Sequence, residues 1–365
     1  MDFCIENKIV LELSKITGAF DVEMLSSAFA NGIDWEKVIQ VASKNKVLNL
    51  LYRNLIKLNL EKNIPHYYKM LFDDSCSCNY IRNEHKLLEL EYIQKQAKDN
   101  GILMAVVKGG YLIDNIYRDR GIRKTNDIDI LIRRSDIKLL HNMMLQNGYQ
   151  YGEYNSTSNS VIPPSKVQNM LYKTRMYNLL PYVKIDNSVP RKTVIFDFSF
   201  ALDFSLDTTP VEEMLESAVL KNNALTLQPE HFFIHMCCHH YREASNVAWI
   251  LLGKDLNLIK FCDVREFVLQ NMNESTILKA VEFAKKHHLE KAVYFTIYFL
   301  REIYNDGYET DILNLLNIED EAFLHQYGEN DYGEMRTRKK DFWTSLFSID
   351  NKDEINEQPK YKQLI

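Results

Sequence analysis

Residues 102–132 read ILMAVVKGGYLIDNIYRDRGIRKTNDIDILI, and the order of elements in this stretch is the clearest structural signal in the chain. The continuous apolar run Ile102–Val107 contains β-branched residues and predicts a short buried strand. The turn Lys108–Gly110 interrupts the run, and apolar residues then recur at helical spacing as far as Tyr117. Asp127–Ile132 predicts a second strand, so the expected order is strand, glycine turn, helix and strand.

Asp127 and Asp129 are two positions apart on the second predicted strand, where alternate side chains point to the same face. Two like charges on one face repel each other, so the strand gains no stability from this pair. A divalent cation removes the conflict, and Mg²⁺ commonly binds through one or two carboxylates together with substrate phosphates. The pair therefore predicts Asp127 and Asp129 as metal ligands and catalytic residues.

A third acid is needed for the usual two-metal arrangement, in which two ions about 3.5–4 Å apart hold the attacking and leaving oxygens. Asp197 is the candidate because it lies on the predicted strand Thr193–Phe200 among bulky apolar neighbours, where an unpaired charge is costly. Asp186 and Asp203 are rivals, but both are nearer to loop signals. We therefore predict that Asp197 completes the metal site.

The glycine turn predicts a phosphate-binding site. Backbone N–H groups exposed between a strand and a helix form a ready anion site, and Lys108 adds a positive charge. Arg123, four residues before Asp127, can reach a phosphate from the loop side. The residues predicted to bind the nucleotide here are Lys108, Gly109, Gly110 and Arg123.

The rest of the chain is mostly helical by pattern. Asp34 caps a predicted helix that begins at Trp35, and Ser135 caps another that ends before Gly148. A Ser- and Asn-rich stretch at residues 155–160 predicts a loop. The other predicted helices are Ile81–Asn100, a helix from Pro229 through His239, Leu251–Gln270, Ser275–Lys286 and Leu289–Tyr304, and two weaker strand candidates are Leu171–Tyr177 and Tyr182–Ile185.

The residues that carry a family resemblance are Val107–Leu112, Tyr117, Gly121–Arg123, Asp127–Ile132 and the pair Gly148-Tyr149. In these positions the chain resembles the uncharacterised bacterial nucleotidyltransferase family of the polymerase-β-like superfamily. Trp35–Ile56 resembles the helical cap of that family, Ile195–Phe198 its third-acid strand, and Leu227–His239 the helix that follows. The likeness covers roughly residues 30–300 and is strongest between residues 103 and 150.

This resemblance implies an α+β fold, in which a small mixed sheet with helices forms a polymerase-β-like nucleotidyltransferase core. The core would lie between an N-terminal helical cap and a C-terminal helical region. The resemblance also implies Mg²⁺ as cofactor and a nucleoside triphosphate as substrate. With the helical patterns on either side, the expected division is residues 1–100 for the N-terminal helical region, 101–205 for the core, 206–305 for the C-terminal helical region and 306–365 for a C-terminal extension.

Two positions depart from the superfamily pattern. Gly110 stands where many members have a serine whose hydroxyl helps to hold the triphosphate, and Ser199 stands where a histidine often follows the third acid. Neither departure removes a metal ligand. Both bear on the affinity for the nucleotide and on the rate.

Lys260 and Asp263 are further nucleotide-binding candidates. Asp263 falls inside the apolar stripe of its predicted helix, which is unusual for a solvated charge, and the resembled family carries a similar acid there. A structural ion pair explains Asp263 equally well. His235 and His239 share a helix face and invite a zinc interpretation, but no second ligand pair is evident, and a packed core is the better explanation.

Composition limits the classes of function. The chain has 365 residues, with 46 % apolar and 26 % charged residues, as in a globular protein. The net charge of −6 argues against a chain whose whole surface binds nucleic acid, although a local basic groove is compatible with an acidic average. No apolar run reaches the ~18 residues of a membrane span, the N-terminus lacks a signal pattern, and six cysteines are too few for a disulfide scaffold. These features predict a cytoplasmic protein that does not contact a membrane.

The sequence therefore predicts a nucleotidyltransferase that uses Mg²⁺, with two ions, to transfer a nucleotidyl group from a nucleoside triphosphate, releasing pyrophosphate. AMP from ATP is the first candidate for that group, and the acceptor is a small molecule, a peptide or a protein. Two alternatives stay open. One is a catalytically silent module on the same fold that binds a nucleotide or a partner. The other is a nucleotidyltransferase that modifies RNA.

Overall fold

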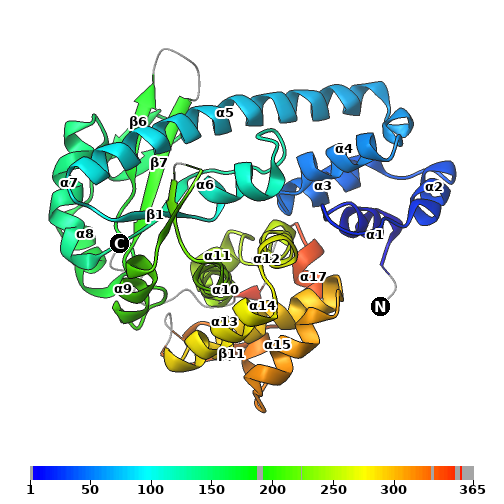
Figure 1. Ribbon diagram of the computed structural model, residues 1–365. Helices are drawn as coiled ribbons and strands as arrows, with labels where there is room; N and C mark the ends of the chain where they lie inside the picture. The colour runs from blue at the N-terminus through cyan, green and yellow to red at the C-terminus, as the bar shows by residue number, and fades with distance from the viewer. Residues whose placement is uncertain (1–2, 187–191, 223, 330–332, 350–353, 356–365) are drawn as a thin grey trace. The chain divides into compact units, whose positions relative to one another are not determined.

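The computed structural model describes residues 3–186, 192–222, 224–329, 333–349 and 354–355 (Figure 1). Its contacts divide the chain into two compact units. The unit that we call the helical unit comprises residues 1–80, 119–124 and 236–364, and the one that we call the sheet unit comprises residues 81–118 and 125–235. Each unit is built from stretches that are separate in the sequence.

The sheet unit contains a seven-stranded mixed sheet in the order β3-β6-β7-β2-β1-β9-β8. Strand β1 is antiparallel to β2 and parallel to β9, whereas β2 is parallel to β7. The edges are formed by antiparallel pairs, β3 with β6 and β8 with β9. The strands are β1 Met104–Val107, β2 Ile128–Ile132, β3 Gln150–Tyr151, β6 Tyr182–Asp186, β7 Lys192–Ser199, β8 Val219–Lys221 and β9 Ala224–Thr226.

Strand register brings three stretches of the sheet unit together. Val107, the last residue of β1, lies opposite Asp129 of β2. On the other side of β2, Asp129 lies beside Asp197 of β7. All five residues of β2 are buried, because the strand is central in the sheet and both of its faces are covered. The end of β1 and the middle of β7 therefore flank a single position, Asp129.

Helices and a hairpin complete the sheet unit. The long helix α5 (His66–Asp99) contributes its second half, and its buried stripe includes Leu90, Ile93 and Ala97. Gln94 of this helix donates hydrogen bonds to the carbonyl oxygens of Met104 and Leu225, at 3.2 Å each. The remaining elements are α6 Gly109–Leu112, the π-helical turn η2 Ile113–Tyr117, η3 Arg134–Asp136, α7 Ile137–Gln146, the hairpin β4 Glu153–Asn155 with β5 Ser160–Ile162, α8 Lys166–Arg175 and α9 Thr209–Glu216.

The helical unit packs short helices around an aromatic and aliphatic core. Helix α10 (Pro229–Ser245) supplies residues to both units. The other elements are α1 Ile5–Glu12, α2 Val22–Ala30, α3 Trp35–Lys44, α4 Leu48–Lys57, η1 Glu61–Asn63, α11 Val247–Leu251, α12 Leu258–Asn271, α13 Glu274–Lys286, α14 Glu290–Ile303, α15 Tyr308–Leu316, η4 Ala322–His325, β10 Gln326–Tyr327, β11 Arg336–Thr337 and α17 Phe342–Phe347.

Most elements match the sequence-based expectations. The strands after Gly101, at Asp127, at Tyr182 and at Thr193 are confirmed within two residues of their predicted bounds. Asp34 caps α3 as expected, since its side chain accepts a hydrogen bond from the backbone N–H of Lys37. The α+β fold with a mixed sheet is therefore confirmed.

Five local predictions are wrong or incomplete. The weak strand at Leu171–Tyr177 is helix α8, which a capping box of Ser165 and Gln168 initiates. Ser135 lies in η3 and does not cap α7, whose N-cap is Asp136. The predicted loop at residues 155–160 is the turn of the β4–β5 hairpin. The predicted helix Leu251–Gln270 is interrupted between α11 and α12, and the helix predicted from Ile81 begins already at His66.

None of the described helices is long and apolar enough to cross a membrane.

The division of the chain at residues 100, 205 and 305 is based on the alternation of helices and strands along the sequence. The two compact units are defined by spatial contact, which is a different criterion, so this division stays a prediction.

Candidate active site

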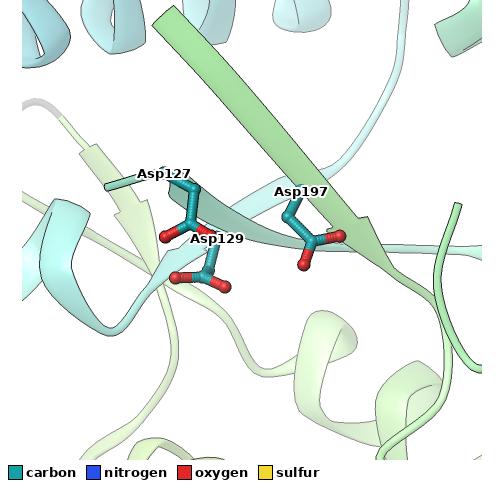
Figure 2. Close-up of side chains that lie close together, drawn as sticks. All are labelled: Asp127, Asp129 and Asp197. Atoms are coloured by element: carbon teal, nitrogen blue, oxygen red, sulfur yellow. The ribbon is translucent and has the colours of Figure 1, made fainter. Parts of the chain in front are cut away.

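Three carboxylates of the sheet unit converge. Asp127 lies immediately before β2, Asp129 is the second residue of β2, and Asp197 lies on β7. One oxygen from each residue lies within 4.8 Å of the other two. Figure 2 shows the three side chains together, two from the β2 stretch and one from the neighbouring strand. The third acid predicted from the sequence is therefore the one that joins the pair.

The alternation of side chains along the two strands explains this convergence. Asp129 and Asp197 are register partners on parallel neighbours, so their side chains emerge side by side from the same face. Their sequence neighbours Ile128, Ile130, Phe196 and Phe198 point to the opposite face and are at most 1 % exposed. A one-residue slip would turn the acids into that apolar core, and the burial of the neighbours therefore fixes the orientation of the acids.

The rivals for the third position lie elsewhere. Asp186 is at the end of β6, opposite Lys192 of β7. Asp203 follows β7 in a turn and accepts a 2.9 Å hydrogen bond from the backbone N–H of Ser205. Neither belongs to the carboxylate cluster found among the described residues.

Asp129 is the most constrained of the three acids. Its residue is 8 % exposed, and burial raises the pKa of its carboxyl group to about 7. Lys108 opposes this shift, whereas the negative charges of Asp127 and Asp197 add to it. A buried carboxylate beside two others is therefore unstable in its charged form without a positive partner. A divalent cation supplies that charge, and carboxylate oxygens are the ligands that Mg²⁺ prefers.

Lys108 provides part of the missing positive charge. It directly follows β1, and its ammonium group forms a salt bridge with the Asp129 carboxylate. The backbone of Lys108 has φ +48° and ψ −130°, a region that residues with a side chain rarely adopt. Backbone strain of this kind is held by the surrounding structure and is concentrated at functional sites. Here it occurs where β1 ends and α6 begins, next to the acids.

Gly110 has a packing role in the turn. A Cβ atom at this position would lie 2.7 Å from Cγ2 of Val106, with Ile128 and Leu90 next nearest at 3.5 Å. A side chain at position 110 would therefore point into the apolar core, together with Ile128 and away from the acids. The glycine allows α6 to start close against β1. The departure from the serine of the superfamily thus removes no group directed at the carboxylates in this chain.

Arg123 and Asp263 lie in the helical unit and pair with each other. Nε of Arg123 is 2.8 Å from Oδ1 of Asp263, and one terminal nitrogen of Arg123 is 2.6 Å from Oδ2, so the pair is bidentate. Both residues are buried, at 9 % and 5 % exposure. The ion pair accounts for the charge in the apolar stripe of α12, and a role of either residue at a nucleotide stays a prediction.

Lys260 also lies in the helical unit, where its ammonium group is 2.5 Å from Oε2 of Glu243. It donates further hydrogen bonds to the carbonyl oxygens of Lys254 and Asp255, at 3.0 and 2.9 Å. The other oxygen of Glu243, Oε1, lies 3.2 Å from Nε2 of His239. This lysine is therefore embedded in a buried polar cluster, and its predicted contact with a nucleotide is a separate proposal.

The helix with His235 and His239 forms no metal cluster in the part of the chain that the structure describes. Cys237 and Cys238 of the same helix are buried and unbridged. Burial raises the pKa of the Cys237 thiol well above its usual value, which keeps it protonated. A packed core, the simpler of the two interpretations from the sequence, describes these residues.

Asn178 was not foreseen from the sequence. Its side-chain amide donates a 3.1 Å hydrogen bond to Oδ1 of Asp197, and its backbone bridges to Ser199 at the end of β7. The residue lies after α8 and one position beyond the predicted strand Leu171–Tyr177, and no spacing rule connects it to an acid 19 residues later. Only the fold brings the two side chains together.

Comparison with known proteins agrees with this geometry. Residues 31–305 match the model of a family described as uncharacterised nucleotidyltransferase, which is well over half of the chain. No curated protein matches the chain. The matched region includes the glycine turn, all three acids of the cluster and Asn178. The chain thus belongs to this family of uncharacterised nucleotidyltransferases and is itself a nucleotidyltransferase.

Proposed function

We propose that the protein transfers a nucleotidyl group, in the first instance AMP from ATP, to a nucleophile on a small molecule, a peptide or a protein, with Mg²⁺ as the cofactor. The observation that supports this most directly is the convergence of Asp127, Asp129 and Asp197 beside the turn that follows β1. The cytoplasm is the proposed location.

The three acids would hold the divalent cations. Asp127 and Asp129 come from one strand and Asp197 from its parallel neighbour, so they can surround cations from two sides. When bound, Mg²⁺ supplies positive charge to the phosphates and to the attacking oxygen. Two ions are the proposed number, because three carboxylates bring more negative charge than one Mg²⁺ neutralises.

The chain's own groups would position the triphosphate. Lys108 would contact a phosphate, and the backbone N–H groups of Gly109 and Gly110 would lie beside it, at the start of α6. The acceptor oxygen then forms a bond to the α-phosphorus while the bond from that phosphorus to the pyrophosphate oxygen breaks. The acceptor proton passes to Asp197 or to water. Positioning and charge neutralisation carry most of the catalysis in such a reaction.

Arg123, Lys260 and Asp263 are proposed as nucleotide-binding residues. Arg123 and Asp263 are supported by the resemblance and by their unusual burial as charged groups, and Lys260 lies on the same helix as Asp263 and is only partly exposed. Each already has a partner in the helical unit, so a nucleotide contact would add to an existing polar network. The proposal for these three residues is independent of the one for the carboxylates.

The alternatives have less support. A silent binding module has no use for three mutually repelling carboxylates, one of which has a pKa raised to about 7. A transferase that modifies RNA would gain from a basic surface, and the chain has a net charge of −6. A peptide, protein or small-molecule acceptor is therefore the preferred class.

A transfer assay with acid variants tests the proposal. The full-length protein is incubated with each nucleoside triphosphate, Mg²⁺ and acceptor pools, and nucleotide adducts are detected by mass together with pyrophosphate release. We expect adducts with the wild-type protein and at least a ~10³-fold lower rate for Asp127→Asn and Asp129→Asn, because each removes a negative metal ligand. Asp203→Asn is the matched control and keeps the full rate. Equal rates for Asp129→Asn and the wild type would refute the assigned roles.

A further inference from the structure

The segment Tyr177–Leu179 is fixed against the end of β7. The backbone N–H of Leu179 donates to the carbonyl oxygen of Phe198 at 2.8 Å, and the N–H of Phe200 donates to the carbonyl oxygen of Tyr177 at 3.0 Å. Between these two bonds, Asn178 forms an antiparallel bridge with Ser199. The position of Asn178 relative to β7 is therefore set by the main chain on both sides, which gives its side chain little freedom.

The side chain of Asn178 reaches the third acid. Its Nδ2 donates a 3.1 Å hydrogen bond to Oδ1 of Asp197. This contact holds one oxygen of the carboxylate and restricts rotation of the carboxylate about the Cβ–Cγ bond of Asp197. The opposite assignment of the amide would place Oδ1 of Asn178 against the carboxylate, oxygen against oxygen, so the hydrogen-bonding pattern fixes the orientation.

The other end of the amide is left without a partner. Oδ1 of Asn178 is buried and accepts no hydrogen bond from any of the described residues. A buried polar atom left in this way costs about 1–3 kcal/mol of stability. A leucine has the same number of side-chain heavy atoms as asparagine and would leave no polar atom without a partner at this position. The donor group of the amide, which bonds Asp197, is therefore the part of this side chain that the described residues use.

The chemistry of the donor suits a metal site. An amide N–H is neutral, so it orients a carboxylate without cancelling the negative charge that attracts a cation. A lysine in the same place would compete with the cation, as we expect of Lys108, which forms a salt bridge with Asp129. Partners of metal-ligating groups outside the ligand set commonly control ligand orientation, and their loss weakens metal binding by about 10–100-fold.

We propose that Asn178 is a positioning residue for Asp197, which orients this carboxylate toward the cations shared with Asp127 and Asp129. The proposal rests on the proposed function, in which Asp197 is a metal ligand. Mg²⁺ requires nearly ideal octahedral geometry, and the placement of each ligand oxygen therefore affects affinity. Asn178 acts through Asp197 and does not itself contact substrate.

Two variants separate this role from a structural one. Asn178→Leu removes both the donor and the unpartnered oxygen and keeps the number and branching of the side-chain heavy atoms. Asn178→Ala removes the same groups by shortening the side chain, which leaves a cavity. Mn²⁺ is the probe, and its binding to the full-length protein is followed by electron paramagnetic resonance and calorimetry. Thermal unfolding without metal gives the stability. Asn147→Ala is the matched control, because Asn147 also makes side-chain hydrogen bonds in the sheet unit, to Tyr92 and to Met143.

We expect Asn178→Leu to unfold at the same temperature as the wild type or higher, and to bind Mn²⁺ about 10–100-fold more weakly. Asn178→Ala shows the same loss of Mn²⁺ affinity with lower stability, and Asn147→Ala keeps wild-type affinity. Wild-type Mn²⁺ affinity in Asn178→Leu would overturn the positioning role and leave the proposed function intact. Absence of Mn²⁺ binding in the wild type itself would contradict the proposed function and this proposal together.

Discussion

At the scale of single residues, the site is governed by competition for one carboxylate. Asp129 is buried beside two other acids, and the groups that can neutralise it are a proton, the ammonium of Lys108 and a divalent cation. Lys108 occupies that role in the structure, with a strained backbone. Under the proposed function, a cation at Asp129 would displace the lysine, which would then become available to a phosphate.

Replacing Lys108 by Met should strengthen metal binding and weaken nucleotide binding. Without the competing ammonium, we expect Mn²⁺ affinity at pH 8 to rise several-fold. We also expect triphosphate affinity to fall by about tenfold, since the charge-assisted contact with a phosphate is lost. Mn²⁺ titration and nucleotide calorimetry measure the two effects, and Lys138→Met, an exposed lysine of the same unit, is the control. A fall in Mn²⁺ affinity would show that Lys108 does not compete with the cation.

The raised pKa of Asp129 makes both the stability of the metal-free protein and its affinity for metal depend on pH. Its folded value of about 7 lies above the ordinary 3.8, so the native state holds this proton more tightly than the unfolded chain does. The stability that this proton contributes without metal is therefore fully present below pH 3.8 and is lost as pH rises toward 7. Metal binding requires the charged carboxylate, so below pH 7 the proton on Asp129 must be released once as the site fills.

We accordingly expect Mn²⁺ affinity to fall by up to about tenfold for each pH unit below 7 and to level off above it. Titrations between pH 5.5 and 8.5 in buffers of different ionisation enthalpy measure both the affinity and the number of protons released. Proton release near one at pH 6 and near zero at pH 8 is the expected result. An Mn²⁺ affinity that does not change between pH 6 and 8 would contradict the assignment of Asp129, with its raised pKa, as a metal ligand.

At the scale of elements, the sheet positions the acids and could largely be predicted. The period-two alternation of β2 and β7 gave the side on which Asp127, Asp129 and Asp197 lie, since their apolar neighbours must face the core. Predictions from the apolar pattern failed where a helix-capping signal favours another structure or where a contact depends on the tertiary fold. In α8 a capping box outweighs the β-prone residues near Tyr172, and the hydrogen bond of Asn178 depends on tertiary placement alone.

Gly110 connects these elements, and its replacement tests the close packing of α6 on β1. Gly110→Ala places a methyl group 2.7 Å from Cγ2 of Val106, a residue with no exposed surface. Overpacking of this kind costs about 1–3 kcal/mol of unfolding free energy. Urea unfolding measures the loss. The double variant Gly110→Ala/Val106→Ala should recover part of it, and unchanged stability in the single variant would show that the turn has room.

At the scale of the whole molecule, the family match of residues 31–305 extends over residues of both units. The fold class could be inferred from the order of strand, glycine turn and acid pair together with the resemblance. The acceptor could not be, because acceptor pockets are formed by side chains scattered along the sequence, and one fold serves many substrates. The sequence also does not identify the partners of Arg123, Lys260 and Asp263, although an ion pair is one of the two explanations that it allows for Asp263.

The Arg123–Asp263 pair allows its structural and nucleotide-binding roles to be separated. Arg123→Ala alone removes the bidentate partner of the buried Asp263, which costs about 3–5 kcal/mol of stability. The double variant Arg123→Met/Asp263→Leu removes both charges and should regain most of that loss. If the proposed nucleotide role is right, the stable double variant binds the triphosphate at least ~10-fold more weakly in calorimetry. Wild-type affinity in the double variant would leave the pair with a structural role alone.

The central claim is that three carboxylates of the sheet unit bind divalent cations for nucleotidyl transfer. Crystals of the protein grown with Mn²⁺ and a non-hydrolysable nucleoside triphosphate analogue, measured at the manganese absorption edge, locate the ions by anomalous scattering. We expect anomalous peaks coordinated by Asp127, Asp129 and Asp197 and by phosphate oxygens, with Lys108 displaced from Asp129. Fully occupied nucleotide with no peak among these three carboxylates would contradict the claim.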